Sequence, residues 1–295
     1  MTFGIIPNIA KDGMLNVVNM IAAKLKLHGY DFILSSSLNG FHDQFTDILK
    51  QAPLMPHDEL SEKSDMVISI GGDGTMLNTA YEVRKYKTPL LGVNMGKLGF
   101  LAEFKINEID EFITDIKNGN YVIEERMALE AICCETGEKE LFAINDLVID
   151  KGRWPKMIEL TIKIDDDYVS TFSADGIIAS TPTGSTGYSL SVGGPIVSPK
   201  ADAITLSPIA PHTLTVRPLV LASNQKIEIS VKSPASNIQI NCDGQRVLYY
   251  DSPMTLLIFK SSNPIRLVHT DKTNYFETLR TKLFWGIDAR KANHQ

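Results

Sequence analysis

The chain lacks several features that mark particular classes of protein. It holds only three cysteines in 295 residues, and two of them, Cys133 and Cys134, are adjacent. Adjacent cysteines have neither the spacing of a zinc site nor that of an ordinary disulfide framework. We therefore expect the three thiols to act as small hydrophobic side chains in a reducing compartment.

The chain also has no excess of basic residues and no long apolar run. Its net charge is −6, from 29 Lys and Arg against 35 Asp and Glu, which argues against non-specific binding of nucleic acid. No apolar stretch approaches the roughly 20 residues of a membrane span. The first seven residues lack a basic region followed by a long apolar one, so no signal peptide is expected. These absences predict a cytoplasmic protein without nucleic-acid or membrane partners.

The first third of the sequence alternates between strand and helix patterns. Short apolar runs predict strands, and apolar residues at helical spacing predict helices between them. The predicted strands are residues 3–6, 31–35, 66–70 and 89–93, and the predicted helices are residues 13–30, 76–86 and 106–119. Such alternation predicts an α/β domain over residues 1–120 with a mostly parallel sheet.

The pattern changes after residue 120. Apolar and polar residues alternate over residues 158–164, 227–231 and 238–242, as in half-buried strands. This predicts a β-rich second domain over residues 121–270. In the tail, Phe276, Leu279 and Leu283 return to helical spacing, so we expect a helix over about residues 271–290 that packs back on the first domain.

The most informative feature is Gly71-Gly72-Asp73-Gly74-Thr75, which lies between a predicted strand and a predicted helix. Glycines let the backbone approach a ligand closely, and a helix N-terminus attracts anions. The turn lacks the Lys and Ser/Thr of a Walker A loop and is not Gly-x-Gly-x-x-Gly. A carboxylate repels phosphate, so Asp73 must either bind a metal or handle a proton. Both roles indicate phosphoryl transfer.

Two further segments suit a nucleotide. Residues 173–195 are rich in glycine and small hydroxyl residues around Tyr188, which could stack on a base. The pair Asn145-Asp146 interrupts an apolar strand, where polar side chains need partners. Ribose hydroxyls or an adenine edge would supply those partners. A bulge or a turn at a strand end is the alternative for this pair, and a loop without a ligand is the alternative for residues 173–195.

Taken together, these segments resemble the NAD kinase family. The matching motifs occur in the family's order and cover about residues 66–245. They are Gly71 to Thr75, residues 92–101, Asn145-Asp146, residues 175–195, residues 211–214 with Arg217-Pro218, and Asp243-Gly244-Gln245. The resemblance implies the family's two-domain fold, an α/β N-terminal domain and a β-rich, NAD-binding C-terminal domain.

The resemblance also implies the reaction. The family moves the γ-phosphoryl group of ATP to the 2′-hydroxyl of the adenosine ribose of NAD, which gives NADP. Asp73 would accept the proton of that hydroxyl or orient it, and a divalent cation, Mg²⁺, would bridge the donor phosphates. The sequence does not decide between a proton-accepting and a metal-binding role for Asp73, and no side chain is assigned as a dedicated metal ligand. Homo-oligomers, either dimers or tetramers, are implied as well, and a homotetramer is expected.

Individual site residues follow from the same resemblance. Asp73 is the implied catalytic residue, Asn145 and Asp146 the adenosine clamp, and Phe100 a packing surface for adenine. The full set of implied nucleotide contacts is Asp73, Gly74, Phe100, Asn145, Asp146, Lys156, Ser173, Asp175, Thr186, Gly187, Tyr188, Ser189, Leu190, Ser191 and Gln245. Lys151 and Arg153 are alternatives to Lys156, and a solvated basic turn is the alternative for all three.

Some positions depart from the family pattern. Asp146 stands where many members have Glu, and Ser173 stands where some carry Arg. Asn78 occupies a position where some relatives carry Arg, which leaves ATP and polyphosphate both open as donors. A lipid kinase, which shares the glycine–Asp turn, and a non-catalytic dinucleotide sensor are the competing interpretations.

Overall fold

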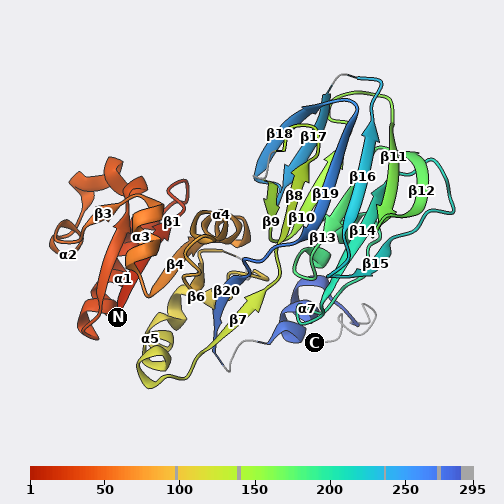
Figure 1. Cartoon of the computed structure of the whole chain (residues 1–295). Coiled ribbons are helices and arrows are strands. Elements are labelled where there is room, and N and C mark those ends of the chain that lie inside the picture. The colour runs from red at the N-terminus through yellow and green to blue at the C-terminus, as the bar shows by residue number, and fades with distance from the viewer. Residues whose placement is uncertain (97–98, 138–140, 236, 271–273, 287–295) are drawn as a thin grey trace. The chain divides into compact units, whose positions relative to one another are not determined.

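The computed structural model describes residues 1–96, 99–137, 141–235, 237–270 and 274–286 (Figure 1). The chain divides into two compact units. The first contains Met1–Glu125 and Arg266–Gln295, and the second contains Arg126–Ile265. The second unit is therefore inserted within the sequence of the first. We call the first the N-terminal unit and the second the C-terminal unit.

The N-terminal unit alternates strands and helices, as the sequence predicts. Its elements are β1 (Thr2–Pro7), α1 (Met14–Leu27), β2 (Asp31–Ser35), η1 (Ser36–Gln44), α2 (Asp47–Lys50), β3 (Leu54–Met55), α3 (His57–Lys63), β4 (Met66–Gly71), α4 (Asp73–Val83), β5 (Leu90–Asn94), β6 (Phe104–Lys105), η2 (Ile106–Glu108), α5 (Ile109–Asn118), β7 (Val122–Arg126), β20 (Ile265–His269) and α7 (Tyr275–Leu283).

These strands form one eight-stranded sheet. Its order is β3-β2-β1-β4-β5-β20-β7, with β6 paired to β5. Parallel pairing joins β1 to both β2 and β4, and β4 to β5. Because β1 lies between β2 and β4, the chain turns to opposite sides after β1 and β4. This is the topological switch point of the sheet, where open α/β sheets bind their ligands.

Helix α4 begins earlier than the sequence suggests. The prediction placed its start at Met76, whereas the helix begins at Asp73 with Gly72 as its N-cap. Thr75 lies within the first turn, where its Oγ1 accepts a hydrogen bond from the Gly72 N–H at 3.4 Å. Apolar spacing could not detect this first turn, because its residues are glycine, Asp and Thr. Asp73 therefore lies at the positive end of the helix.

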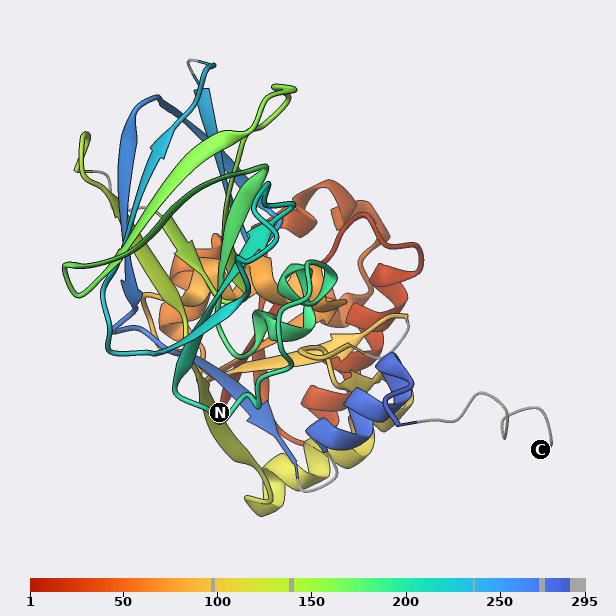
Figure 2. The ribbon, with the colours of Figure 1, turned by 90° about the vertical axis from the view of Figure 1, so that its right-hand side faces the viewer.

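The tail of the chain contributes α7 to the N-terminal unit. The sequence predicted a helix over about residues 271–290, of which 271–273 and 287–290 lie outside the described residues. Figure 2 shows α7, in blue, beside the yellow α5. The two helices line a common hollow of about 360 Å³.

The C-terminal unit is built from antiparallel strands. Its elements are β8 (Leu129–Cys133), β9 (Leu141–Ala143), β10 (Asp146–Asp150), β11 (Ile158–Ile164), β12 (Asp167–Ala174), β13 (Gly176–Ser180), η3 (Gly184–Thr186), α6 (Tyr188–Ser191), β14 (Ala203–Ile209), β15 (Leu219–Ala222), β16 (Ile227–Lys232), β17 (Asn237–Cys242), β18 (Arg246–Asp251) and β19 (Met254–Lys260). They form two six-stranded sheets, β15-β14-β13-β10-β17-β18 and β12-β11-β16-β19-β8-β9.

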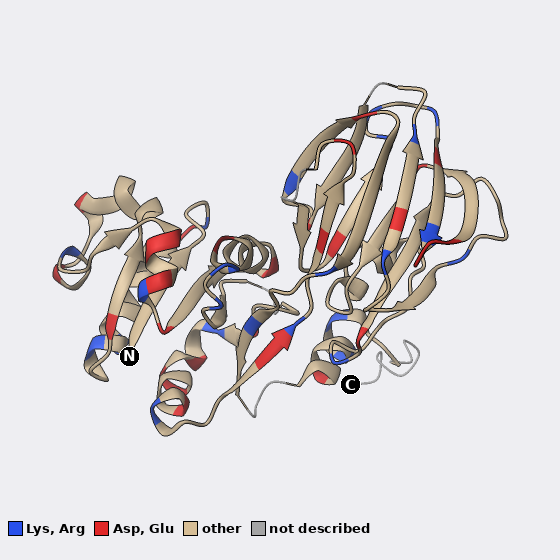
Figure 3. Cartoon of the chain, viewed as in Figure 1, with Lys and Arg blue, Asp and Glu red and all other residues tan. Residues whose placement is uncertain are grey.

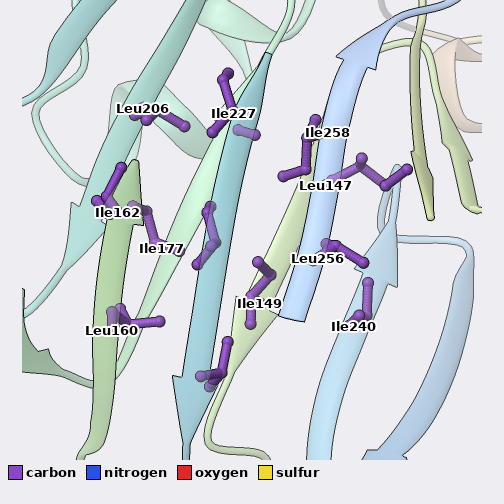
Figure 4. Packing of buried hydrophobic residues seen from close by; sticks show 14 of the residues in the cluster. Leu147, Ile149, Leu160, Ile162, Ile177, Leu206, Ile227, Ile240, Leu256 and Ile258 are labelled. Carbon is purple, nitrogen blue, oxygen red and sulfur yellow. The ribbon is translucent and has the colours of Figure 1, made fainter. Parts of the chain in front are cut away.

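Side chains from both sheets form one hydrophobic core in this unit. The alternation in β11, for example, buries Leu160 and Ile162 while Glu159 is exposed. Figure 4 shows Leu160 and Ile162 with Ile177 and Ile240, which come from the other sheet. The two-domain fold class predicted from the sequence, α/β followed by β-rich, is confirmed.

The cysteines, the charged residues and the apolar character of the helices can be examined in the structure. All three cysteines are free thiols; Cys133 and Cys242 are buried in the core, and Cys134 is exposed. Burial raises the pKa of the Cys242 thiol to about 11, so this thiol is un-ionised and unreactive at neutral pH. Acidic and basic residues are interspersed in both units (Figure 3). None of the described helices is long and apolar enough to cross a membrane.

The core of the C-terminal unit provides a stability test. Ile240 is fully buried, and Ile240→Ala should reduce the free energy of unfolding by about 2–5 kcal/mol, because it removes buried methyl groups and leaves a cavity. Val247 on the neighbouring strand is 45% exposed, so Val247→Ala is the matched control and should cost at most about 0.5 kcal/mol. Urea unfolding of both variants measures the difference, and equal losses would contradict this assignment of the core.

Candidate functional site

The glycine turn lies at the switch point of the N-terminal sheet. It follows β4, and Asn8 follows the neighbouring β1. The Asn8 N–H donates to the Ile70 carbonyl at 2.8 Å, and its Nδ2 donates to Thr75 Oγ1 at 3.2 Å. A Cβ on Gly71 would lie 2.2 Å from Thr75 Oγ1, so the turn has room only for glycine there. These contacts fix the first turn of α4 against the ends of two strands.

The Asp73 carboxylate is held by backbone amides. Its Oδ1 accepts hydrogen bonds from the N–H groups of Leu101 and Ala102, each at 3.0 Å. Its Oδ2 accepts one from the Phe100 N–H at 2.8 Å. Three consecutive amides thus fix the orientation of the carboxylate, which remains about one-third exposed. The ammonium of Lys282, on α7, lies 3.5 Å from Oδ2.

In the C-terminal unit, the pair Asn145-Asp146 lies at the start of a strand and not in its interior. β9 ends at Ala143 and β10 begins at Asp146, so Asn145 occupies a bend between them. The bend explains why a polar pair interrupts an apolar sequence, and it corresponds to the strand-end alternative considered for this pair.

A buried aspartate holds this bend together. One carboxylate oxygen of Asp243, Oδ1, accepts hydrogen bonds from the N–H groups of Ile144 at 2.9 Å, Asn145 at 2.7 Å and Asp146 at 3.2 Å. Asp243 itself has φ 57°, a left-handed conformation that Asp tolerates better than most residues. The turn after β17 therefore determines the shape of the bend before β10.

The hydroxyl-rich segment packs on the same bend. The Thr181 N–H donates to the Asn145 carbonyl at 2.9 Å, and its hydroxyl donates to the Ile144 carbonyl at 2.5 Å. A Cβ on Gly184 would lie 2.1 Å from the Asn145 carbonyl oxygen, so this close approach requires glycine. A Cβ on Gly187 would lie 3.7 Å from Asp146 Oδ2. The structure thus brings together three segments that the sequence predicted separately.

Two polar groups at this bend are suited to a ligand. The Oδ1 atom of Asn145 is buried and has no hydrogen-bond partner among the described residues. Such an orphaned acceptor is rare in folded proteins, and an amino group of a ligand would satisfy it. Burial, together with the nearby Asp243 carboxylate, raises the pKa of Asp146 to about 7. Perturbed carboxyl groups of this kind are typical of functional sites.

The predicted residues of α6 and its flanks differ in exposure. Tyr188 is 47% exposed, so its ring is available to a ligand. Ser189 is fully buried, and its hydroxyl is hydrogen-bonded to that of Ser207 at 3.0 Å. Thr186 donates to the Thr183 carbonyl at 3.3 Å. Of these three side chains, only Tyr188 presents a large free surface. The remaining predicted residues of this segment are Gly187 and Leu190, half-buried, and Ser191, exposed.

Four other predicted residues of the C-terminal unit belong to strands and turns other than this bend. Asp175 forms an ion pair with Lys151, with Nζ and Oδ1 2.6 Å apart, so the alternative basic residue Lys151 is already engaged. Lys156 is exposed and has no ion-pair partner among the described residues. Ser173 is exposed on β12, where its carbonyl accepts the N–H of His212 at 2.9 Å. Gln245 is exposed in the turn after Asp243.

Two hollows lie elsewhere on the units. In the C-terminal unit, Lys151, Arg153, Trp154, Gln239 and Tyr249 are among the residues that line a hollow of about 540 Å³. In the N-terminal unit, the described residues that line the hollow between α5 and α7 include five acidic ones, Glu103, Glu108, Glu111, Asp115 and Glu277, and one lysine. That acidic lining does not suit an anionic nucleotide.

Sequence reasoning missed two residues. The motif analysis assigns no role to Asp243, although an Asp-Gly pair after an alternating strand signals a turn in which Asp adopts positive φ. The other residue is Lys282, in the tail of the chain. Its signal is the spacing from Tyr275, since residues seven apart lie on the same face of a helix.

The raised pKa of Asp146 leads to a test by stability. The same carboxyl group has a pKa of about 4 in the unfolded chain, so between about pH 4 and pH 7 the folded chain binds more protons than the unfolded chain. The free energy of unfolding therefore falls as the pH rises through this range, because Asp146 must ionise in a buried position. Asp146→Asn removes this charge, so its melting temperature relative to the parent should rise between about pH 5 and about pH 8.

Asp202→Asn is the control for this measurement. A hydrogen bond from Lys260, and a second from Ser223, lower the pKa of Asp202, so it is ionised at both pH values whether folded or unfolded. Its effect on the melting temperature should not change between them. An Asp146→Asn difference that is equally constant would contradict a pKa near neutrality.

Comparisons with known proteins agree with this geometry. Residues 3–121 match the family model of the ATP-NAD kinase N-terminal domain, and residues 144–270 match that of the ATP-NAD kinase C-terminal domain. The chain is 41% identical over 295 residues to a protein named NAD kinase from Prosthecochloris aestuarii, covering 99% of this chain and 100% of that one. It is 40% identical over 294 residues to one from Chlorobium phaeovibrioides, covering 98% and 100%.

Solved structures give the same fold. The yeast NADH kinase complexed with NADH matches with a TM-score of 0.88 at 24% identity, over 98% of this chain and 89% of that one. An NAD kinase from Archaeoglobus fulgidus in complex with ATP matches with a TM-score of 0.76 at 25% identity, over 96% and 99%. The resemblance predicted from the sequence is confirmed, and this chain belongs to the NAD kinase family of phosphotransferases.

Proposed function

We propose that this chain transfers the γ-phosphoryl group of ATP to the 2′-hydroxyl of the adenosine ribose of NAD, which gives NADP and ADP. Full-length relatives at about 40% identity are named NAD kinase, which supports the proposal. In this reaction the 2′-oxygen forms a bond to the γ-phosphorus, the bond from that phosphorus to the leaving oxygen of ADP breaks, and the hydroxyl proton must be taken up.

The observation that carries the proposal is the Asp73 carboxylate. It lies in the first turn of α4, at the end of β4, and three amides fix its orientation. A carboxylate in that position can accept the hydroxyl proton or orient the hydroxyl for in-line attack. Oδ1 already accepts two amide hydrogen bonds and Oδ2 only one, so we assign the substrate hydroxyl to Oδ2.

Magnesium fits this site as part of the substrate. The described residues contain no group of three or more side chains that could hold a metal ion. Mg²⁺ is commonly bound through substrate phosphates and water with few protein ligands. We therefore propose that it arrives as the MgATP complex, where it neutralises phosphate charge.

We assign adenosine binding to Asn145 and Asp146. The unpartnered, buried Oδ1 of Asn145 suits an amino donor such as that of adenine, and Asp146 suits a ribose hydroxyl. Tyr188 and Phe100 offer ring surfaces. The remaining proposed contacts are Gly74, Lys156, Ser173, Asp175, Thr186, Gly187, Ser189, Leu190, Ser191 and Gln245. A homotetramer and a cytoplasmic location are proposed from the family resemblance.

A coupled assay tests the activity. Purified protein is incubated with NAD, ATP and Mg²⁺, and NADP is measured with an NADP-dependent dehydrogenase. We expect NADP to form in proportion to enzyme, and replacing ATP with polyphosphate identifies the donor. Phosphorylation of diacylglycerol without NADP would instead identify a lipid kinase. Tight binding of NAD without any turnover would identify a sensor.

Asp73→Asn tests the role of the carboxylate. The amide side chain keeps the size of Asp but cannot accept the hydroxyl proton, so kcat should fall by about 100-fold or more. Binding of NAD, measured by calorimetry, should change little, because the adenosine contacts are assigned to other residues. A variant that keeps the parent kcat would remove Asp73 from the chemistry.

Gly99→Ala tests whether the position of the carboxylate matters. The added Cβ would lie 1.8 Å from Asp73 Oδ1, so the carboxylate must leave its amide donors. We expect kcat to fall by about tenfold or more, because small displacements of a catalytic group are costly. Gly96→Ala is the matched control, since its Cβ would approach no described atom closer than 3.8 Å. Equal kcat values for the two variants would show that the carboxylate position is unimportant.

A further inference from the structure

The glycine turn carries a carboxylate but no cation of its own. Gly71-Gly72-Asp73-Gly74-Thr75 contains no Lys or Arg. A phosphoryl group that approaches an ionised Asp73 brings further negative charge to the same place. In phosphoryl transfer, catalysis depends almost entirely on positioning and on stabilising this charge. A fixed positive group near Asp73 would therefore serve the reaction.

The structure places such a group at Asp73. The Lys282 ammonium is 3.5 Å from Asp73 Oδ2, and it also lies 4.8 Å from the centre of the Phe100 ring. Phe100 contributes twice, because its N–H donates to the same Oδ2 at 2.8 Å. The ammonium, the carboxylate oxygen and the aromatic ring thus form one compact group, in which the cation has an electrostatic partner on two sides.

Packing of α7 directs Lys282 to this position. Tyr275, Thr278, Leu279 and Lys282 follow helical spacing, so they lie on one face. Thr278 and Leu279 are buried, at 7% and 4% exposed. Tyr275, at the start of the helix, contacts the same Phe100 with ring centroids 6.3 Å apart. Tyr275 and Lys282, at the two ends of this face, therefore both contact Phe100, and these contacts fix the lysine relative to Asp73.

The burial of this pair distinguishes it from ordinary surface ion pairs. Exposed pairs on flexible side chains contribute little. Here the side chains of Lys282 and Asp73 are 27% and 32% exposed, and both are held by further contacts. By contrast Lys24 and Asp110, also in the N-terminal unit, form a pair in which the aspartate is 66% exposed. Oδ2, the oxygen that meets Lys282, is also the one assigned to the substrate hydroxyl.

We propose that Lys282 is a positioning residue for the reaction: it holds Oδ2 of Asp73 and supplies the positive charge that the glycine turn lacks. This inference rests on the proposed function, because it assigns Lys282 to the same phosphoryl transfer. The ammonium matters most when the γ-phosphoryl group is closest to Asp73. Its loss should therefore reduce kcat much more than it changes the KM for NAD.

Three variants test the proposal in the full chain. Lys282→Met keeps the length of the side chain and removes the charge, Lys282→Arg keeps the charge, and Arg280→Met removes an exposed charge two residues away on the same helix. Each is measured for kcat, for KM with NAD and for melting temperature. We expect Lys282→Met to lower kcat by about 10- to 100-fold, with the KM for NAD changed by less than about threefold. Lys282→Arg should recover most of this loss, and Arg280→Met should match the parent.

A chemical rescue separates the charge from a purely structural role. In Lys282→Ala, added ethylammonium should restore part of the lost kcat in a saturable manner, without raising the melting temperature. The inference is overturned if Lys282→Met retains the parent kcat, if Arg280→Met loses as much, or if ethylammonium has no effect. Failure of the proposed function is seen separately, because the parent chain would then form no NADP.

Discussion

The hydrogen bonds from three consecutive amides to the Asp73 carboxylate are the constraint on which the site in the N-terminal unit depends. They connect the first turn of α4 to residues 100–102 and hold the carboxylate at the switch point of the sheet. Asp243 has a similar role in the C-terminal unit, where its Oδ1 accepts hydrogen bonds from the N–H groups of residues 144–146. In both places a carboxylate gives shape to a bend that lacks regular backbone pairing.

The two aspartates differ in what remains available to a ligand. Asp73 is about one-third exposed, so part of its carboxylate can meet a substrate. Asp243 is 7% exposed, and burial raises its pKa despite the hydrogen bonds it accepts. Asp243 therefore contributes by fixing the backbone of residues 144–146, which positions the side chains of Asn145 and Asp146. The same side-chain chemistry thus leaves a partly exposed carboxylate in one unit and a shaped stretch of backbone in the other.

Much of the fold follows from the sequence because periodicity reports burial directly. The buried run of β4 and the alternation of β11 were both predicted, since each reflects the faces of a strand. The start of α4 was not, because glycine and Asp carry no periodic signal. Asn145-Asp146 was recognised as unusual, but its place in a bend depends on Asp243, 98 residues away from Asn145 in the sequence. Contacts of that kind, including Lys282 with Asp73, require the tertiary structure.

The insertion of one unit into the other has a consequence for synthesis on the ribosome. In the finished N-terminal unit β5 pairs with β20, so Leu90 pairs with Leu267. The whole of the C-terminal unit is made between these strands. Until β20 emerges, β5 lacks this partner, and exposed strand edges are prone to association with other chains. The segment that bears Lys282 emerges later still. Translation rate and chaperone access during synthesis of the C-terminal unit should therefore influence the yield of the N-terminal sheet.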